Sequence, residues 1–169
     1  RADAPGVDAA SILAANAAGD FTGEQVLLDV NALAAGHAYF SIGSYEVSPD
    51  GRLLAWTEDT SGRRQYVIRI RELDSGTLLP EAVAGVAPDL VWAADARTLL
   101  YIENDPETLL TVRVKAHVAG SDPATDALLY EEEDDSYYLG IDRSRDERYL
   151  LIHASSTVSD EVRYAPLEA

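Results

Sequence analysis

Three histidines are the residues best suited to acid–base chemistry in this sequence: His37, His117 and His153. Serine hydrolysis needs such a base beside a serine on a tight turn, with an acid that orients the base. The nearest approach to a Gly-x-Ser-x-Gly elbow is "IGSYE" around Ser44, which lacks the second glycine. His117 and His153 fall in separate predicted strands and His37 falls in a connector. We therefore predict structural or surface roles for all three, and no catalytic residue is assigned.

Metal and cofactor chemistry finds equally little support. The acidic run at 131–135, "EEEDD", lacks the spaced ligands and the central glycine of a calcium loop, so it is predicted to be a solvated turn. No zinc-protease motif, phosphate loop or dinucleotide fingerprint occurs, and there is no cysteine. No metal-binding or cofactor-binding residue is assigned, and no cofactor is expected. Trp56 and Trp92 lie in apolar predicted strands, which favours core positions over ligand stacking.

Charge is the strongest feature of the composition. The 169 residues include 30 Asp and Glu against 13 Lys and Arg, a net charge of −17. Such a chain repels phosphate, which argues against nucleic acid or an anionic membrane as a partner. It would attract cationic peptides, although a solvated acidic surface explains the same composition. No apolar run approaches the length of a membrane span. A start at Arg1 and the lack of methionine predict a processed chain or an internal piece of a longer one.

A turn of the form Asp-x-Arg, followed by an apolar strand, occurs three times at spacings of 45 and 51 residues. The three pairs are Asp50 with Arg52, Asp95 with Arg97, and Asp146 with Arg148. Each aspartate is expected to accept hydrogen bonds from its own turn, with the arginine on the surface. Their role is predicted to be structural.

The strands between these turns repeat as well. A second strand with period-two alternation is clearest at 66–71. Its predicted counterparts are 111–118 and 161–167; opening strands are predicted at 39–47, 88–93 and 137–141, and closing strands at 24–30, 77–81 and 127–133. The stretch 31–37, "NALAAGH", is predicted to form one helical turn, and no longer helix is predicted. Antiparallel four-stranded units of 45–50 residues are typical of β-propeller blades.

The predicted fold class is therefore all-β, a partial β-propeller. Residues 38–85 and 86–133 are predicted to be full blades, 1–37 the end of a leading blade with its connector, and 134–169 the front of a further blade. A β-sandwich remains the structural alternative, although the threefold recurrence of the turn favours the propeller. Since propellers have about four to eight blades, this chain does not close a ring. Its uncovered faces predict self-association.

Several strings resemble the oligopeptidase B (protease II) branch of the prolyl oligopeptidase family. They are "SGRRQY", "YEEEDDSYYLG" and "SDEVRY", and the resemblance runs from about Glu24 to about Tyr164. Residues 1–23 depart from the family pattern. The family's α/β-hydrolase domain, with its Ser, Asp and His triad, has no counterpart in the sequence. No catalytic residue is therefore carried over.

The resemblance implies a cytoplasmic serine peptidase that cleaves short peptides after arginine or lysine. It also implies a seven-bladed propeller that covers the active site and restricts entry, of which this chain would form roughly the first half. The implied partners are the hydrolase domain and short basic peptides, and the residues that contact substrate are not assigned. The isolated chain is expected to be inactive. The alternative is a stand-alone propeller module that binds proteins or peptides without enzymatic activity.

Overall fold

The computed structural model describes residues 9–19 and 25–167, and within them the fold is built mainly from β-strands. The helices are α1 (Ala9–Ala18), α2 (Val30–Ala34) and the 3-10 turn η1 (Pro123–Thr125). The strands are β1 (Ser41–Val47), β2 (Leu53–Asp59), β3 (Tyr66–Glu72), β4 (Val83–Trp92), β5 (Thr98–Asn104), β6 (Thr111–Val118), β7 (Ala127–Glu131), β8 (Tyr138–Arg143), β9 (Tyr149–Ser155) and β10 (Asp160–Pro166).

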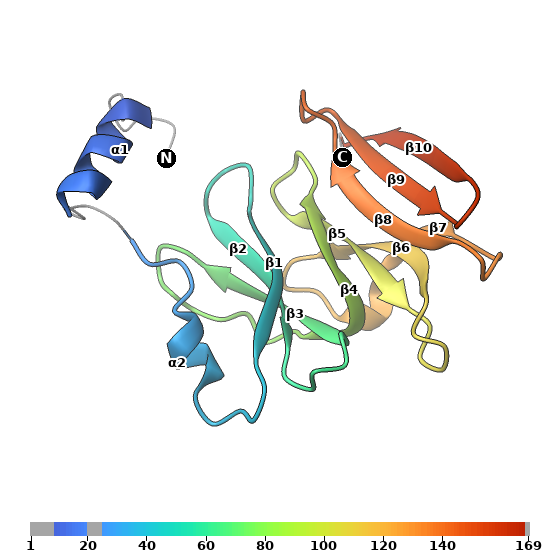
Figure 1. Cartoon of the computed structure of the whole chain (residues 1–169), viewed down its shortest axis with the longest axis horizontal. Helices are drawn as coiled ribbons and strands as arrows, with labels where there is room; N and C mark the ends of the chain where they lie inside the picture. The colour runs from blue at the N-terminus through green and yellow to red at the C-terminus, as the bar shows by residue number, and fades with distance from the viewer. Residues whose placement is uncertain (1–8, 20–24, 168–169) are drawn as a thin grey trace.

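The strands form two antiparallel sheets. β1 to β7 pair in chain order in one curled sheet, and β8, β9 and β10 form a second sheet beside it (Figure 1). The first strands of successive units, β1, β4 and β8, lie next to one another: β4 contacts β1 on one side and β8 on the other. Such an arrangement of first strands is that of a propeller, in which units surround a common axis. The predicted all-β fold with partial propeller architecture is confirmed.

The core lies on both faces of the middle unit, which comprises the strands β4 to β7. On β5, Leu99 and Tyr101 pack in one apolar cluster together with Trp92, whereas Leu100 and Ile102 pack in a second cluster. Neighbouring residues of the strand therefore point into different clusters. This double burial explains why β5 reads as a continuous apolar run rather than as an alternation of apolar and polar residues.

The closing strand predicted at 77–81 is wrong as a separate strand. It is reduced to a bridge between Arg71 and Leu78, and the pairing with β3 resumes only at Val83. The amide of Leu79 still donates to the carbonyl of Ile70 at 2.8 Å, and the regular pairing ends at Pro80. The chain then continues as β4, which pairs with β3 and with β5 and is longer than the opening strand predicted at 88–93. The division into blades at residue 85 stays a prediction.

The N-terminal region differs from expectation in two ways. Residues 25–29 form no strand, so the closing strand predicted at 24–30 is wrong in the described part, and Glu24 lies outside it. Asp29 accepts a hydrogen bond from the amide of Ala32 at 3.0 Å and caps α2, which confirms the predicted helical turn. α1 was not predicted, because its alanine-rich sequence has high helix propensity but no amphipathic period.

Apolar side chains remain exposed on the first and on the last strand of the described chain. Tyr45 on β1 is 59% exposed, and Tyr164 on β10 is 73% exposed. Both lie on strands at the edge of a sheet. Self-association of the chain stays a prediction, with these two surfaces as its basis.

Gly43 offers a test of how closely the inner strands approach. The amide of Ser44 donates to Thr57 Oγ1 at 2.9 Å, and that hydroxyl donates to the carbonyl of Pro88 at 3.1 Å. A Cβ on Gly43 would lie 2.7 Å from Thr57 Oγ1 and 2.8 Å from Pro88 Cβ. Gly43→Ala should therefore lower the free energy of unfolding by about 1–3 kcal/mol. Urea denaturation followed by tryptophan fluorescence measures the change.

The matched control is Gly140→Ala on β8. A Cβ at Gly140 would meet no atom closer than 3.9 Å, so its unfolding midpoint should stay the same or rise slightly. Equal midpoints for the two variants would contradict the close approach of β1 to β4.

Candidate functional site

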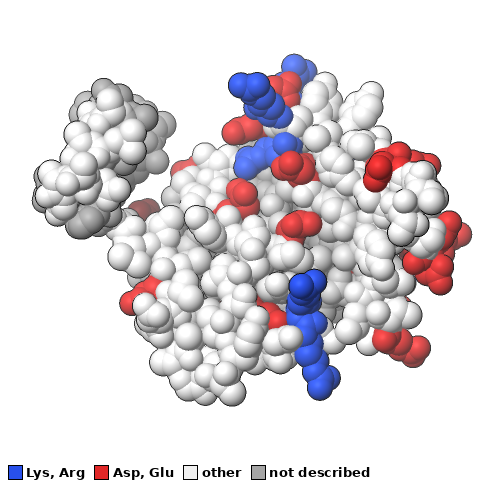
Figure 2. All heavy atoms as spheres, in the orientation of Figure 1, with Lys and Arg blue, Asp and Glu red and all other residues white. Residues whose placement is uncertain are grey.

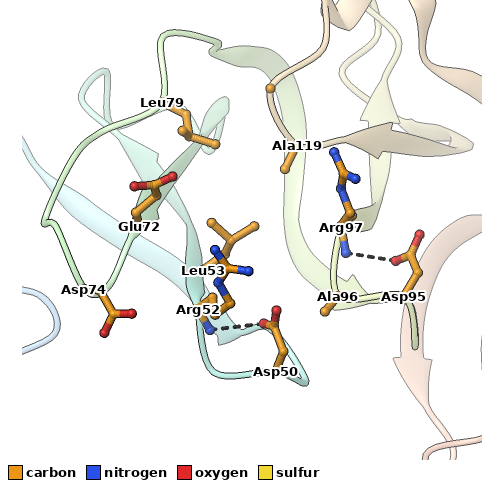
Figure 3. A pocket seen from close by; sticks show the side chains of 11 residues that line it. Asp50, Arg52, Leu53, Glu72, Asp74, Leu79, Asp95, Ala96, Arg97 and Ala119 are labelled. Carbon is orange, nitrogen blue, oxygen red and sulfur yellow. Dashed lines mark hydrogen bonds between the residues drawn. The ribbon is translucent and has the colours of Figure 1, made fainter.

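The first candidate is a cavity of about 400 Å³ between the first two Asp-x-Arg turns (Figure 3). It is lined by Asp50, Arg52, Leu53, Glu72, Asp74, Leu79, Asp95, Ala96, Arg97, Ala119 and Gly120. The charged groups come from turns of two successive units. No serine or histidine is among the lining residues, so the cavity has no nucleophile and no imidazole base.

The aspartates of these turns are held by their own turns. Asp50 Oδ1 accepts from Ser48 Oγ at 2.6 Å and from the amide of Arg52 at 3.1 Å. Asp95 Oδ1 accepts from the amides of Arg97 and Thr98 at 2.9 and 2.8 Å. Both arginines are exposed. The predicted hydrogen bonds within these two turns and the surface positions of their arginines are confirmed.

The third turn repeats the arrangement. Asp146 Oδ1 accepts from Ser144 Oγ at 2.6 Å and from the amide of Arg148 at 3.3 Å, and Arg148 is exposed. The residue between aspartate and arginine has left-handed backbone in all three turns. These residues are Gly51 (φ 72°), Ala96 (φ 58°) and Glu147 (φ 61°). Only the first turn carries the glycine that this conformation favours, so sequence alone did not reveal the shared backbone.

Hydrogen bonding keeps these carboxylates ionised. The hydrogen bond from Ser48 is the main cause that lowers the pKa of Asp50. Burial raises the pKa of Asp95, but the hydrogen bonds from Arg97 and Thr98 together outweigh it, so the pKa is lowered. Carboxylates that are ionised and already engaged are poor general acids. This cavity is therefore a structural feature of the repeat.

The second candidate is a groove of about 410 Å³ on the innermost strands, named here the inner-strand groove. It is lined by Ser44 and Glu46 of β1, Asp89 and Leu90 of β4, Gly140, Ile141 and Asp142 of β8, and His153 of β9. Each of the three innermost strands thus contributes one carboxylate. Ser44 and His153 share this groove, but within the described residues no hydrogen bond joins their side chains, so they form no nucleophile–base pair.

The carboxylates of the inner-strand groove are in an unfavourable electrostatic environment. Burial raises the pKa of Glu46, and Arg143, at 3.3 Å, only partly opposes that effect. Burial and the nearby Asp142 raise the pKa of Asp89. Figure 2 shows one face of the molecule, with acidic side chains over its right-hand part and basic groups at its top and lower middle. Negative charge placed at an energetic cost in a groove is a common mark of a binding surface for cations.

The histidines predicted to be structural occupy three different environments. His117 is fully buried; its Nδ1 lies 2.8 Å from Asp126 Oδ1 and its Nε2 lies 3.8 Å from Glu81. Tyr101 donates to the other oxygen of Asp126 at 2.8 Å. No local pattern predicted this buried network, because Glu81 and Asp126 lie in connecting segments that are far apart in the chain. His37 is exposed in the connector.

The two tryptophans and the acidic run lie where the sequence predicts. Trp56 and Trp92 are 2% and 0% exposed, which confirms their core positions. The run 131–135 lies mostly exposed at the end of β7 and in the turn that follows it. In the part of the chain that the structure describes, no group of three histidine or acidic side chains is arranged to hold a metal ion. Within the same residues, no helix is long and apolar enough to cross a membrane.

Comparison with known proteins identifies the domain family to which this fold belongs. The model of the prolyl oligopeptidase N-terminal β-propeller domain matches residues 6–169. Dipeptidyl aminopeptidase BI of Pseudoxanthomonas mexicana is 63% identical over 166 residues, which are 98% of this chain and 23% of that protein. Protease 2 of Moraxella lacunata is 30% identical over 141 residues, 82% of this chain and 20% of that protein. The chain thus spans about a fifth to a quarter of these relatives.

Solved structures agree. Oligopeptidase B from Leishmania major superposes with a TM-score of 0.84 at 30% identity, covering 88% of this chain and 21% of that one. Oligopeptidase B from Trypanosoma brucei, in a closed form with covalently bound antipain, gives a TM-score of 0.75 at 27% identity, with coverage of 85% and 20%. The fold of this chain is therefore that of the corresponding part of oligopeptidase B.

Asp95→Ala tests the structural role of the turns. Loss of its hydrogen bonds should lower the free energy of unfolding at pH 7 by about 1 kcal/mol. Because the pKa of Asp95 is lowered in the folded state, its stabilisation is present above its ordinary value of 3.8 and is lost as the pH falls through the folded value. Urea denaturation at pH 7 and pH 3 measures this. Asp74→Ala, in the same cavity but without a side-chain hydrogen bond in the described chain, is the control and should change little.

Asp89→Asn tests the inner-strand groove, and the expected dependence of stability on pH has the opposite sign to that of Asp95. A raised pKa means that the folded state resists ionisation, so wild-type stability falls as the pH rises from 3.8 through the folded value. The variant should therefore be more stable than wild type at pH 7, and the difference should vanish below pH 3.8. Thermal unfolding across that range measures it, with Asp135→Asn in the exposed acidic turn as the control. A variant less stable than wild type at pH 7 would show that Asp89 is a structural residue.

Proposed function

The chain belongs to the prolyl oligopeptidase family as part of its N-terminal β-propeller domain, and from this we propose that it guides short cationic peptides to a serine-peptidase active site. The observation that carries the proposal is the inner-strand groove. Glu46, Asp89 and Asp142 come from three successive innermost strands and face one cavity. The catalytic chemistry would reside in the α/β-hydrolase domain of the larger peptidase.

The groove supports guidance by charge and restriction by size. Closely packed inner strands leave a space of about 410 Å³, which suits a few peptide residues rather than a folded domain. The net charge of −17 extends the attraction beyond the groove and would raise the rate at which cationic peptides arrive. In this proposal the propeller segment acts as an electrostatic guide and a size filter.

Two substrate classes are compatible with such a groove. Cleavage after arginine or lysine is the activity that resemblance to oligopeptidase B implies, and these side chains are cationic. Release of N-terminal dipeptides is the second candidate, favoured by the 63% identity to a protein named dipeptidyl aminopeptidase BI. Such a substrate presents an α-ammonium group. We propose the cytoplasm as the compartment, as the resemblance to oligopeptidase B implies.

A chimera tests the proposal. The chain replaces the matching segment of the Pseudoxanthomonas mexicana enzyme, and the chimera should cleave peptides while the isolated chain should not. Glu46→Gln, Asp89→Asn and Asp142→Asn combined should raise KM for a cationic peptide several-fold at low salt, with little change in kcat. The effect should shrink at high salt, because ions screen the attraction. A neutral peptide should be unaffected.

The control variant neutralises Glu133, Asp135 and Asp160, which are exposed, lie outside the groove and make no side-chain hydrogen bond or ion pair in the described residues, so it removes the same charge elsewhere. Equal effects of the two triple variants would show that net charge alone acts, and the groove would lose its role. Peptides with free and with blocked amino termini separate dipeptide release from internal cleavage. A chimera that binds peptides without cleaving them would favour the stand-alone binding module.

A further inference from the structure

A third cavity, of about 420 Å³, lies where β5 turns into β6, away from the inner-strand groove. It is lined by Gln65, Ala84, Gly85, Glu103, Asn104, Asp105, Pro106, Leu109 and Arg113. Asn104 is only 9% exposed, and its side-chain oxygen has no hydrogen-bond partner among the described residues. A buried polar atom without a partner is costly, and few occur in native proteins. A ligand that donates a hydrogen bond here would remove that cost.

The preceding unit shows what this position does when it has a structural role. Asp59 ends β2 as Asn104 ends β5, and it is 1% exposed. Its carboxylate accepts hydrogen bonds from Ser61, Gly62 and Arg64 and thereby holds its own loop. Every acceptor at this position is used within the fold.

In the second unit the loop is held by Asp105, one residue after the position that corresponds to Asp59. Asp105 Oδ1 accepts from the amides of Glu107 and Thr108 at 2.9 and 2.8 Å, and from Thr108 Oγ1 at 3.0 Å. The loop is therefore held without Asn104. The side chain of Asn104 is buried against the cavity yet free of the role that Asp59 has.

The charges around this cavity leave one carboxylate without an ion pair in the described residues. Arg113 pairs with Glu103 at 3.1 Å and with Glu131 at 2.7 Å. Lys115 takes the second oxygen of Glu103 at 3.1 Å. Among the charged residues that line the cavity, Asp105 alone makes no ion pair in the described chain, and its Oδ2 accepts no hydrogen bond there. Three carboxylates (Glu103, Asp105 and Glu131) thus stand against two cations (Arg113 and Lys115), so the net charge around the cavity is negative.

Taken together, the geometry points to a binding site for a lysine or arginine side chain of a peptide. The ammonium or guanidinium would donate to Asn104 Oδ1 and Asp105 Oδ2, while Pro106 and Leu109 would cover its aliphatic stem. Gln65, exposed at the rim and without a side-chain hydrogen bond in the described residues, is placed to bind the peptide backbone. This inference rests on the proposed function in one respect only: the peptide that binds here is taken to be a substrate of the peptidase.

Binding of small probes to the isotope-labelled chain tests the site, with the side-chain amide signals of Asn104 and Gln65 followed by NMR. N-acetyl-lysine methylamide should shift both signals saturably. N-acetyl-norleucine methylamide, which has the stem without the charge, should bind at least about tenfold more weakly. The free amine n-pentylamine lacks the peptide groups and should also bind more weakly. Equal binding of n-pentylamine would overturn the assignment to a peptide.

Two variants separate binding from folding. Asp105→Asn keeps an oxygen to hold the turn but removes the charge, so it should weaken the lysine probe about tenfold with an unchanged unfolding midpoint. Asn104→Leu should abolish binding. Asp89→Asn, in the inner-strand groove, should leave binding unchanged, so failure here and failure of the proposed function can be told apart. Unmoved Asn104 signals, or full affinity in Asp105→Asn, would overturn the proposal.

Discussion

Burial of the middle unit on both faces is the constraint on which the rest of the structure depends. Leu99, Leu100, Tyr101 and Ile102 are all at most 5% exposed, although neighbouring residues of a strand point in opposite directions. A single sheet cannot bury both of its faces by itself. The unit must therefore lie between two others, and that requirement brings the innermost strands β1, β4 and β8 together.

Close approach of the inner strands then determines what the inner-strand groove can contain. Thr57 links the backbone of Ser44 to that of Pro88, and Gly43 leaves no room for a side chain between them. Trp92 adds a second link, since its indole N–H donates to the carbonyl of Glu46 at 3.0 Å. The carboxylates of the groove are thus placed by rigid backbone rather than by loops, which suits a surface that must keep its geometry as peptides pass.

The local parts of this fold were predictable from sequence, and the parts made by distant residues were not. The strands after Asp50, Asp95 and Asp146 follow from period and turn chemistry, which act over a few residues. The reduction of the 77–81 segment to a single bridge depends on how it pairs with β3, which no local pattern encodes. The inner-strand groove joins Glu46 to Asp142 across almost a hundred positions, so sequence indicated the acidity of the chain but not where it is concentrated.

The acidic residues of this chain fall into two groups by the direction of their pKa shifts, a distinction that the net charge of −17 does not reveal. The aspartates of the turns have lowered pKa values because hydrogen bonds stabilise their ionised form, so their charge supports the fold. Glu46 and Asp89 have raised pKa values because burial opposes their charge, so there the fold tolerates it. A charge that weakens the fold is retained more readily when it serves binding. The acidic residues therefore serve two purposes: those of the turns stabilise the fold, and those of the inner-strand groove are available for binding.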